Sequence, residues 1–177
     1  MCRYPPGLIR NRGMTAVELL FTMAIAGLVM ALAVPNFRDF VQNNRAAEEA
    51  NALVGALAVA RSEAVTRGVP VTVCSSSDNE SCADDLDWST GWIVFTDADD
   101  VGEVNDDDVV LRALPELRNG SELTSNASFV SYGPSGFLTN AAEVTFDLDI
   151  PDCTGNHNRT ISVNLQGRGS VANAACD

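Results

Sequence analysis

The sequence contains no lysine, and His157 is its only histidine. Without lysine the chain has no Schiff-base or Ser–Lys chemistry, and a Ser–His or Cys–His pair has a single candidate base with no recognisable motif around it. The segment Gly133-Pro134-Ser135-Gly136 is not a nucleophile elbow, because that pattern needs a residue between the serine and the second glycine. These absences predict a protein that is not an enzyme.

Basic residues are scarce throughout the chain. There are 11 of them against 24 acidic residues, which gives a formal net charge of −13. Arg3, Arg10 and Arg12 precede residue 13, and without them 8 basic residues stand against 24 acidic ones, a net charge of −16. Such a chain repels nucleic acid and anionic surfaces, so we expect protein partners and no nucleic acid.

Charge is almost absent from Met14 to Val34, where Glu18 is the only charged residue in 21 positions. At about 1.5 Å of rise per residue, a helix over this segment is roughly 31 Å long, which matches the hydrocarbon core of a bilayer. A carboxylate within a membrane-spanning helix costs roughly 2.5–3.5 kcal/mol, so we expect it to have a partner and a purpose. The segment predicts a single membrane span with one functional acid.

The residues on either side of this span predict its orientation. The preceding MCRYPPGLIRNRG carries three arginines and no acid, while the long remainder is acidic, so the N-terminus is expected in the cytoplasm and the C-terminal domain outside it. An ordinary signal peptide is the alternative, since Ala31-Leu32-Ala33 is a small-x-small cleavage site. Against it, the apolar run is longer than the core of about 7–15 residues in signal peptides, and it contains an acid.

The junction from Gly13 to Glu18 (GMTAVE), followed by a hydrophobic helix, resembles the class III signal of type IV pilins and type II secretion pseudopilins. The resemblance implies cleavage after Gly13 by a prepilin peptidase and N-methylation of Met14, although the first mature residue of the family is usually Phe. Glu18 becomes the fifth mature residue. In a filament, the new amine of Met14 would neutralise Glu18 of a neighbouring subunit and set the assembly register. A snorkelling or protonated acid without function is the alternative.

Beyond the span, the sequence predicts a long helix that continues and packs on a sheet. Apolar residues recur at alternating steps of four and three and form one stripe: Ala46, Ala50, Leu53, Leu57, Ala60 and Ala64. Gly68 and Pro70 end this helix near Thr66, so from Met14 it would be about 80 Å long, a stalk whose first half leaves the domain. A coiled coil with another chain is the weaker alternative, because the stripe is mostly alanine.

From residue 69 onward the pattern changes to short β-strands. We expect strands at Val69–Cys74, Trp92–Phe95, Val109–Leu114, Ser128–Tyr132, Val144–Leu148 and Thr160–Leu165, six or seven in all, in one or two antiparallel sheets. The predicted class is α+β. Its parts are a cleaved leader (1–13), a membrane-spanning assembly helix (14–34), the amphipathic half of the helix (35–67) and a β domain (68–177).

The order of these strand segments, from WSTGWIVFTD to RTISVNLQGRGSV, resembles the GspH/FimT branch of the minor pilins and pseudopilins. The resemblance implies the type IV pilin fold and a FimU-like minor pilin that helps initiate or cap a type IV pilus, with other minor and major pilins as partners. It implies residence in the bacterial inner membrane and then in a pilus or pseudopilus. A GspH-like minor pseudopilin of a type II secretion system is the alternative.

A second alternative is a FimT-like pilin that binds DNA for competence. Such pilins carry a basic Gly-Arg-x-Arg element, and the matching positions here are Gly167, Arg168, Gly169 and Ser170, so the second arginine is missing. A single arginine on a strongly acidic chain cannot make the several phosphate contacts that DNA binding needs. Arg168 is therefore the only candidate DNA contact, and a turn residue in a hairpin is its simpler interpretation.

Four cysteines remain once the leader with Cys2 is removed: Cys74, Cys82, Cys153 and Cys176. An even number in an exported domain predicts two disulfides, with three connectivities open. Local pairing, Cys74 with Cys82 and Cys153 with Cys176, is favoured because it closes loops of modest length. A zinc site is the alternative, although the spacings contain no C-x2-C pair.

An acidic segment from Asp97 to Asp108 (DADDVGEVNDDD) has seven carboxylates in twelve residues. Asp97, Asp99 and Gly102 fall at positions one, three and six of an EF-hand loop, but Val101 breaks position five and Asp108 replaces the closing Glu. A solvated hairpin loop is the main expectation. Calcium held by Asp97, Asp99 and Asp108 is the alternative, and no other cofactor is expected.

Overall fold

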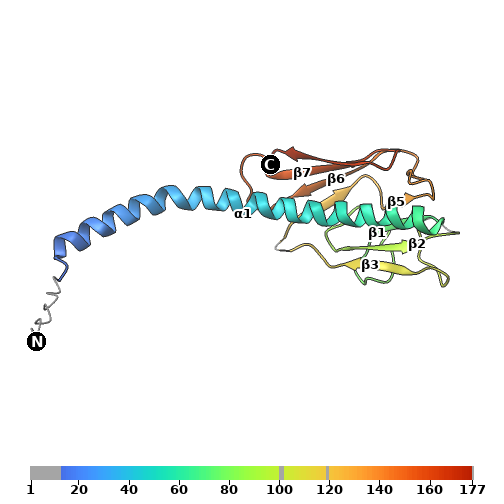
Figure 1. Ribbon diagram of the computed structural model, residues 1–177, viewed down its shortest axis with the longest axis horizontal. Coiled ribbons are helices and arrows are strands. Elements are labelled where there is room, and N and C mark those ends of the chain that lie inside the picture. Colours follow the sequence, from blue (N-terminus) through green and yellow to red (C-terminus); the bar gives the residue numbers. More distant parts are fainter. Residues whose placement is uncertain (1–12, 100–101, 119, 177) are drawn as a thin grey trace, which may run out of the picture. The chain divides into compact units, whose positions relative to one another are not determined.

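The structure is a computed structural model that describes residues 13–99, 102–118 and 120–176, so the predicted leader lies outside the described residues except for Gly13. One helix precedes eight strands: α1 (Ala16–Arg67), β1 (Val71–Ser75), β2 (Trp92–Thr96), β3 (Val110–Leu114), β4 (Glu122–Ser125), β5 (Phe129–Tyr132), β6 (Val144–Asp149), β7 (Asn158–Val163) and β8 (Gly169–Ala174). The chain divides into two units, residues 1–38 and 39–177, and α1 runs through both (Figure 1).

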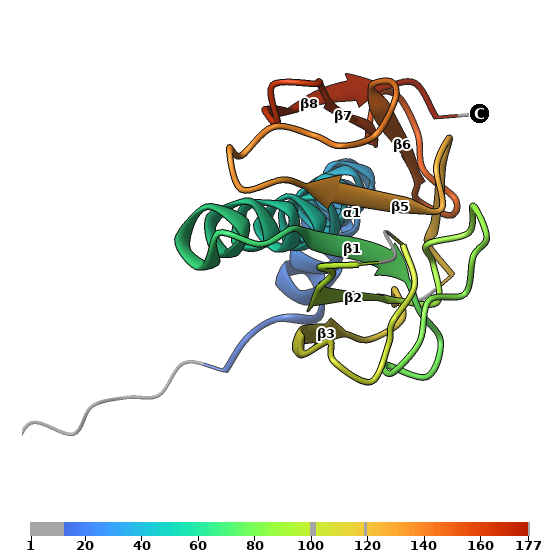
Figure 2. The same cartoon turned by 90° about the vertical axis from the view of Figure 1, so that its right-hand side faces the viewer.

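In the second unit the strands form two four-stranded antiparallel sheets. The strand order is β3-β2-β1-β5 in the first sheet and β4-β6-β7-β8 in the second. Figure 2 shows β3, β2, β1 and β5 stacked in this order, with β6, β7 and β8 grouped apart from them. The register of the first sheet places Val73 of β1 opposite Val94 of β2 and Val130 of β5. The sheets and the second half of α1 together make the predicted α+β domain.

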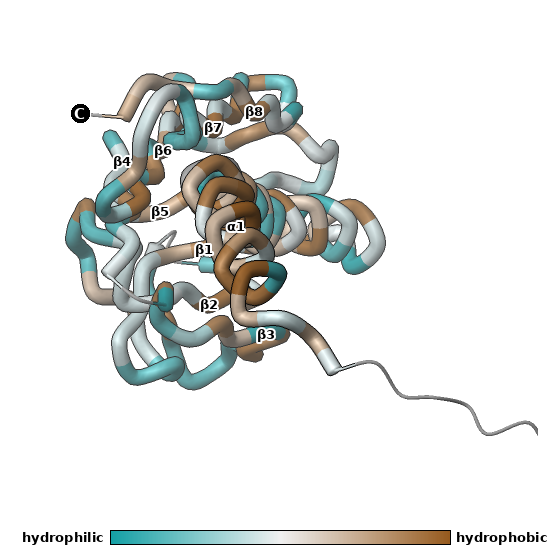
Figure 3. Tube along the Cα trace, turned by 90° about the vertical axis from the view of Figure 1, so that its left-hand side faces the viewer, coloured by the Kyte–Doolittle hydropathy of each residue, from teal (hydrophilic) through white to brown (hydrophobic). Residues whose placement is uncertain are grey.

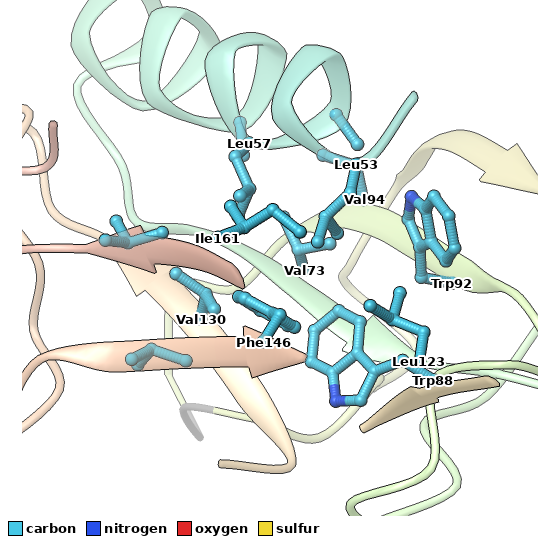
Figure 4. Close-up of a cluster of buried hydrophobic side chains, with 14 of the residues drawn as sticks. Leu53, Leu57, Val73, Trp88, Trp92, Val94, Leu123, Val130, Phe146 and Ile161 are labelled. Atoms are coloured by element: carbon cyan, nitrogen blue, oxygen red, sulfur yellow. The ribbon is translucent and has the colours of Figure 1, made fainter. Parts of the chain in front are cut away.

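The core of this domain lies between α1 and the two sheets. All six residues of the predicted apolar stripe are buried, with at most 3% of their surface exposed. Leu53 and Leu57 point from α1 toward residues of both sheets, among them Val73 and Ile161 (Figure 4). Full burial of each such side chain contributes about 1.5–3 kcal/mol, so the stripe fixes how this part of the helix lies on the domain. The predicted packing of the helix on a sheet is confirmed.

The ends of α1 and of the strands lie close to the predicted positions. The helix ends at Arg67, one residue beyond the prediction, because Gly68 adopts φ of 71° and its amide donates to Ala64 O at 3.0 Å.

All six predicted strands are present, but β4 and β8 were not predicted. β4 is four residues long and begins with a glutamate, and β8 consists mostly of small, exposed residues on an outer strand. Neither has the apolar pattern of a strand.

Candidate assembly site

The first turn of α1 is closed by a reciprocal pair of side chains. The backbone amide and the hydroxyl of Thr15 each donate to Glu18 Oε2 at 2.9 Å, and the Glu18 amide donates to Thr15 Oγ1 at 3.3 Å. This is a capping box, in which a threonine before the helix and a glutamate three residues later satisfy amides that have no partner inside the helix. The pattern Thr-x-x-Glu ahead of an apolar run was present in the sequence, but the prediction for Glu18 missed it.

The predicted processing and assembly residues all lie at this end of the helix. Gly13 and Met14 are exposed and precede Thr15, and Ala16 is the first helical residue. The carboxylate of Glu18 lies in the first turn, where the partial positive charge of the helix N-terminus stabilises it. Within one subunit, therefore, the acid already has a structural partner in Thr15. Its predicted partner in a neighbouring subunit would be an addition to this contact.

The apolar half of α1 in the first unit exposes its side chains along its whole length. Every residue from 14 to 34 is exposed, including large side chains such as Leu20, Phe21, Leu28, Met30 and Leu32. The tube in Figure 3 is brown over much of this part of the chain. The helix is long and apolar enough to cross a membrane. A contiguous apolar surface of this extent marks a membrane or protein contact.

The four cysteines of the β domain are joined in two disulfides. Cys74 at the end of β1 is bonded to Cys82, and Cys153 is bonded to Cys176, 23 residues later in the chain. This is the local pairing that the sequence favours. Because each sulfur is bonded to another sulfur, the zinc alternative does not fit these four residues.

Arg168 lies in the turn between β7 and β8 and is exposed. The Asn164 amide donates to Arg168 O at 3.1 Å, and the Arg168 amide donates to Asn164 Oδ1 at 3.0 Å. Gly167 completes this turn with φ of 75°, a conformation that favours glycine. The Gly-Arg element is thus placed in a tight hairpin turn, as its simpler interpretation predicted.

Arg61 of α1 holds this turn against a second loop. Its Nε donates to Gly136 O at 2.9 Å, and its Nη2 donates to Gln166 O at 3.0 Å. A Cβ atom at Gly167 would lie 2.3 Å from the same Gly136 oxygen. The glycine of the Gly-Arg element is therefore required by close packing between two loops, independently of any ligand.

The acidic segment forms the β2–β3 hairpin loop, but its first residue is not solvated as expected. Asp97 is fully buried, its amide donates to Pro70 O at 3.0 Å, and its Oδ2 accepts from the Gly102 amide at 2.8 Å. Burial raises the pKa of Asp97, although the Gly102 amide acts in the opposite direction. Within residues 13–99, 102–118 and 120–176 no three His, Cys, Asp or Glu side chains are grouped to hold a metal ion. Asp97 instead ties the loop to the sheet.

Comparison with known proteins identifies this architecture. The structure is similar to two crystal structures of the Pseudomonas aeruginosa type IV minor pilin FimU, whose sequence is 23% identical to this chain in both comparisons. One covers 77% of this chain and 92% of FimU with a TM-score of 0.56, and the other covers 72% and 90% with a TM-score of 0.52. The minor pseudopilin EpsH from the type 2 secretion system of Vibrio cholerae follows at 16% identity, 74% and 97% coverage and a TM-score of 0.44. A comparison with curated proteins finds no match.

The similarity to FimU shows a shared fold, with one long helix packed on antiparallel sheets. A family model described as type II transport protein GspH matches residues 49–167, from the packed half of α1 to the β7–β8 turn. Proteins of the pilin and pseudopilin type are structural subunits and not enzymes. Because the matched segment covers more than half of the sequence, the chain belongs to the GspH family of type IV pilin-like proteins.

Proposed function

We propose that the protein is a minor pilin that a prepilin peptidase cleaves after Gly13 and that then helps to initiate or cap a type IV pilus. Residues 14–34 anchor the precursor in the bacterial inner membrane, with the β domain exported. N-methylation of Met14 follows cleavage. The mature subunit joins other minor and major pilins in the periplasm and reaches the cell surface with the pilus.

One observation carries this proposal: every residue from 14 to 34 is exposed and most of them are apolar, whereas the stripe of α1 from Ala46 to Ala64 is buried in the domain. A helix with these two halves is suited to two successive environments, the bilayer before assembly and the apolar interior of a filament after it. A domain that stays in water gains no stability from an exposed apolar helix such as the first half of α1.

A minor pseudopilin of a type II secretion system is the second candidate. The description of the matching family, type II transport protein GspH, favours it. Both candidates require the same processing and the same kind of filament, so they differ in the machinery that the subunit joins. Deletion of the pilus genes or of the secretion genes in the source bacterium, followed by a test of which deletion removes the protein from its filament, distinguishes the two.

Processing is tested by mass spectrometry of the protein extracted from membranes. The expected N-terminus is N-methylated Met14, and Gly13→Ala is expected to remain uncleaved. A mature N-terminus at Val34 would show an ordinary signal peptide and would refute the proposal.

The assembly role of Glu18 is tested with variants that separate its charge from its capping contact. Glu18→Gln removes the charge but keeps a side chain that completes a capping box, and Thr15→Ala removes the cap hydroxyl but keeps the charge. Both variants are expected to insert and be cleaved. Only Glu18→Gln is expected to be lost from sheared filaments, and its normal incorporation would refute the register argument.

A further inference from the structure

A groove runs along one side of the β domain, between residues 41–52 of α1 and the segment 114–118 that follows β3. Trp92 of β2, Leu114 and Leu117 form part of its wall. The volume of the groove is about 450 Å³. That volume falls within the range of about 300–1,000 Å³ typical of ligand pockets. All of these residues belong to the second unit. We call this feature the Trp92 groove.

Two residues that line this groove each have a buried polar atom with no hydrogen-bond partner among the described residues. Trp92 is 1% exposed and its Nε1 has no acceptor there, while the Glu49 side chain is 10% exposed and its Oε2 has no donor. The other tryptophan differs, because Trp88 Nε1 donates to Ala127 O at 3.1 Å. An unsatisfied buried donor or acceptor destabilises a protein, and native proteins leave few of them. A guest that brings one acceptor and one donor would satisfy both once the two buried side chains rotate toward it.

The edge of the first sheet opens beside this groove. β3 is an outer strand: Val110 at its start and Val109 just before it are exposed, and Leu114 at its other end lines the groove. Leu114 is paired with Trp92, so the two side chains lie on the same face of the sheet. If an extended chain is added to β3, its residue opposite Leu114 points to that same face and therefore toward the groove. An extended peptide fits this edge better than a helix.

The charges around the groove favour a basic guest. Arg45 is already engaged, since its Nε donates to Glu49 Oε1 at 3.1 Å and its Nη2 donates to Arg118 O. Glu48 and Glu116 also line the groove and are exposed. Besides Arg45, the only other cationic side chain among the residues that line it is Arg118. Three carboxylates thus face two guanidinium groups. A second copy of this acidic chain, which has no lysine, is a poor occupant.

We propose that the Trp92 groove receives an extended, basic segment of a neighbouring filament subunit. The segment pairs with the edge of β3, places an Arg or Lys side chain against Glu49 Oε2, and offers a backbone oxygen to Trp92 Nε1. The proposal rests on the filament function proposed above and adds the surface through which one neighbour is recognised.

A binding experiment tests the chemistry of the groove in the full chain, held in detergent micelles and labelled with nitrogen-15. The probe is the peptide acetyl-Val-Arg-Val-amide, and the control is acetyl-Val-Glu-Val-amide. The chain has two tryptophans, so Trp88, whose indole is already bonded, is an internal reference for Trp92. The arginine peptide is expected to shift the indole N–H signal of Trp92 and leave that of Trp88 in place.

The matched variant is Glu49→Gln, which keeps the shape of the side chain and removes its charge. Since a hydrogen bond to a charged group contributes about 1.5–3 kcal/mol, this variant is expected to weaken binding of the arginine peptide about tenfold or more. No shift at millimolar peptide, or an equal shift with the glutamate peptide, would overturn the proposal.

A second experiment tests the groove in the filament. A photoreactive benzoylphenylalanine is placed at Ala113 on β3, or at Ala172 on β8, which is also exposed and lies on the outer strand of the other sheet. Cross-linking from Ala113, but not from Ala172, to a basic peptide of another filament subunit supports the proposal. Incorporation into filaments without a selective cross-link at Ala113 overturns it and leaves the filament function standing. Absence of the chain from filaments would instead refute the filament function.

Discussion

Replacement of Gly167 by alanine is expected to destabilise the β domain strongly. Gly167 has φ of 75°, and a Cβ atom there would lie 2.3 Å from Gly136 O, which accepts the Arg61 Nε hydrogen bond at 2.9 Å. The left-handed backbone costs an alanine roughly 1–2 kcal/mol, and displacement of the carbonyl loses a charged hydrogen bond of about 1.5–3 kcal/mol, for a total of about 2.5–5 kcal/mol.

Gly155→Ala is the matched control for this prediction. Gly155 has φ of 78°, but nothing lies within 4 Å of its Cβ position, so its replacement is expected to cost only the backbone part, about 1–2 kcal/mol. Both variants are measured by urea unfolding of the full chain in detergent, followed by tryptophan fluorescence, since both tryptophans are in the β domain. Equal losses of stability in the two variants would show that the contact with Gly136 does not constrain the turn.

Three further predictions concern the cysteines, the buried acid and the exposed arginine. Replacement of Cys153 and Cys176 by serine is expected to cost about 3 kcal/mol, because their disulfide closes a loop with a sequence separation of 23. Urea unfolding measures this loss, and an unchanged midpoint would contradict it. Burial raises the pKa of Asp97 in the folded state, so folding stability falls as pH rises from the ordinary carboxyl pKa through this raised value. Asp97→Asn should therefore be more stable than the wild type at pH 7, with the gain vanishing below about pH 3.5, and thermal unfolding across this range tests it. The wild-type chain is expected to form no complex with DNA in a low-salt mobility-shift titration, and a micromolar complex that is lost in Arg168→Ala would support DNA capture instead.

The packed half of the molecule followed closely from the sequence. The stripe of alanines and leucines in α1 was predicted from its spacing alone, because a helix that covers a sheet repeats its apolar residues at three and four positions. Glu63 and Arg67, four residues apart on the same helix, also form an ion pair, with 2.6 Å between Oε2 and Nε. Such features depend on residues one turn apart and therefore leave a clear local pattern.

Features that depend on distant parts of the chain were not predicted. Asp97 reads as one of many loop acids, and only the fold shows that it is buried at the end of β2. The same holds for the polar atoms of Trp92 and Glu49 that have no partner in the described part of the chain, since only the fold brings β2 and α1 together in one groove. The capping role of Glu18 is different, since its pattern is local. The membrane cost of the acid predicts a partner in another subunit, whereas the capping box supplies one in Thr15 of the same chain.

The capping box at Thr15 and Glu18 also determines what the peptidase of the proposed reaction would encounter. Helical structure begins at Ala16, so the Gly13–Met14 bond lies on the non-helical side of the cap. Proteolysis favours exposed backbone outside regular structure, so this bond is open to cleavage without any unwinding of the membrane helix. Thr15 and Glu18 would thus mark the boundary between the segment that is cut away and the segment that remains.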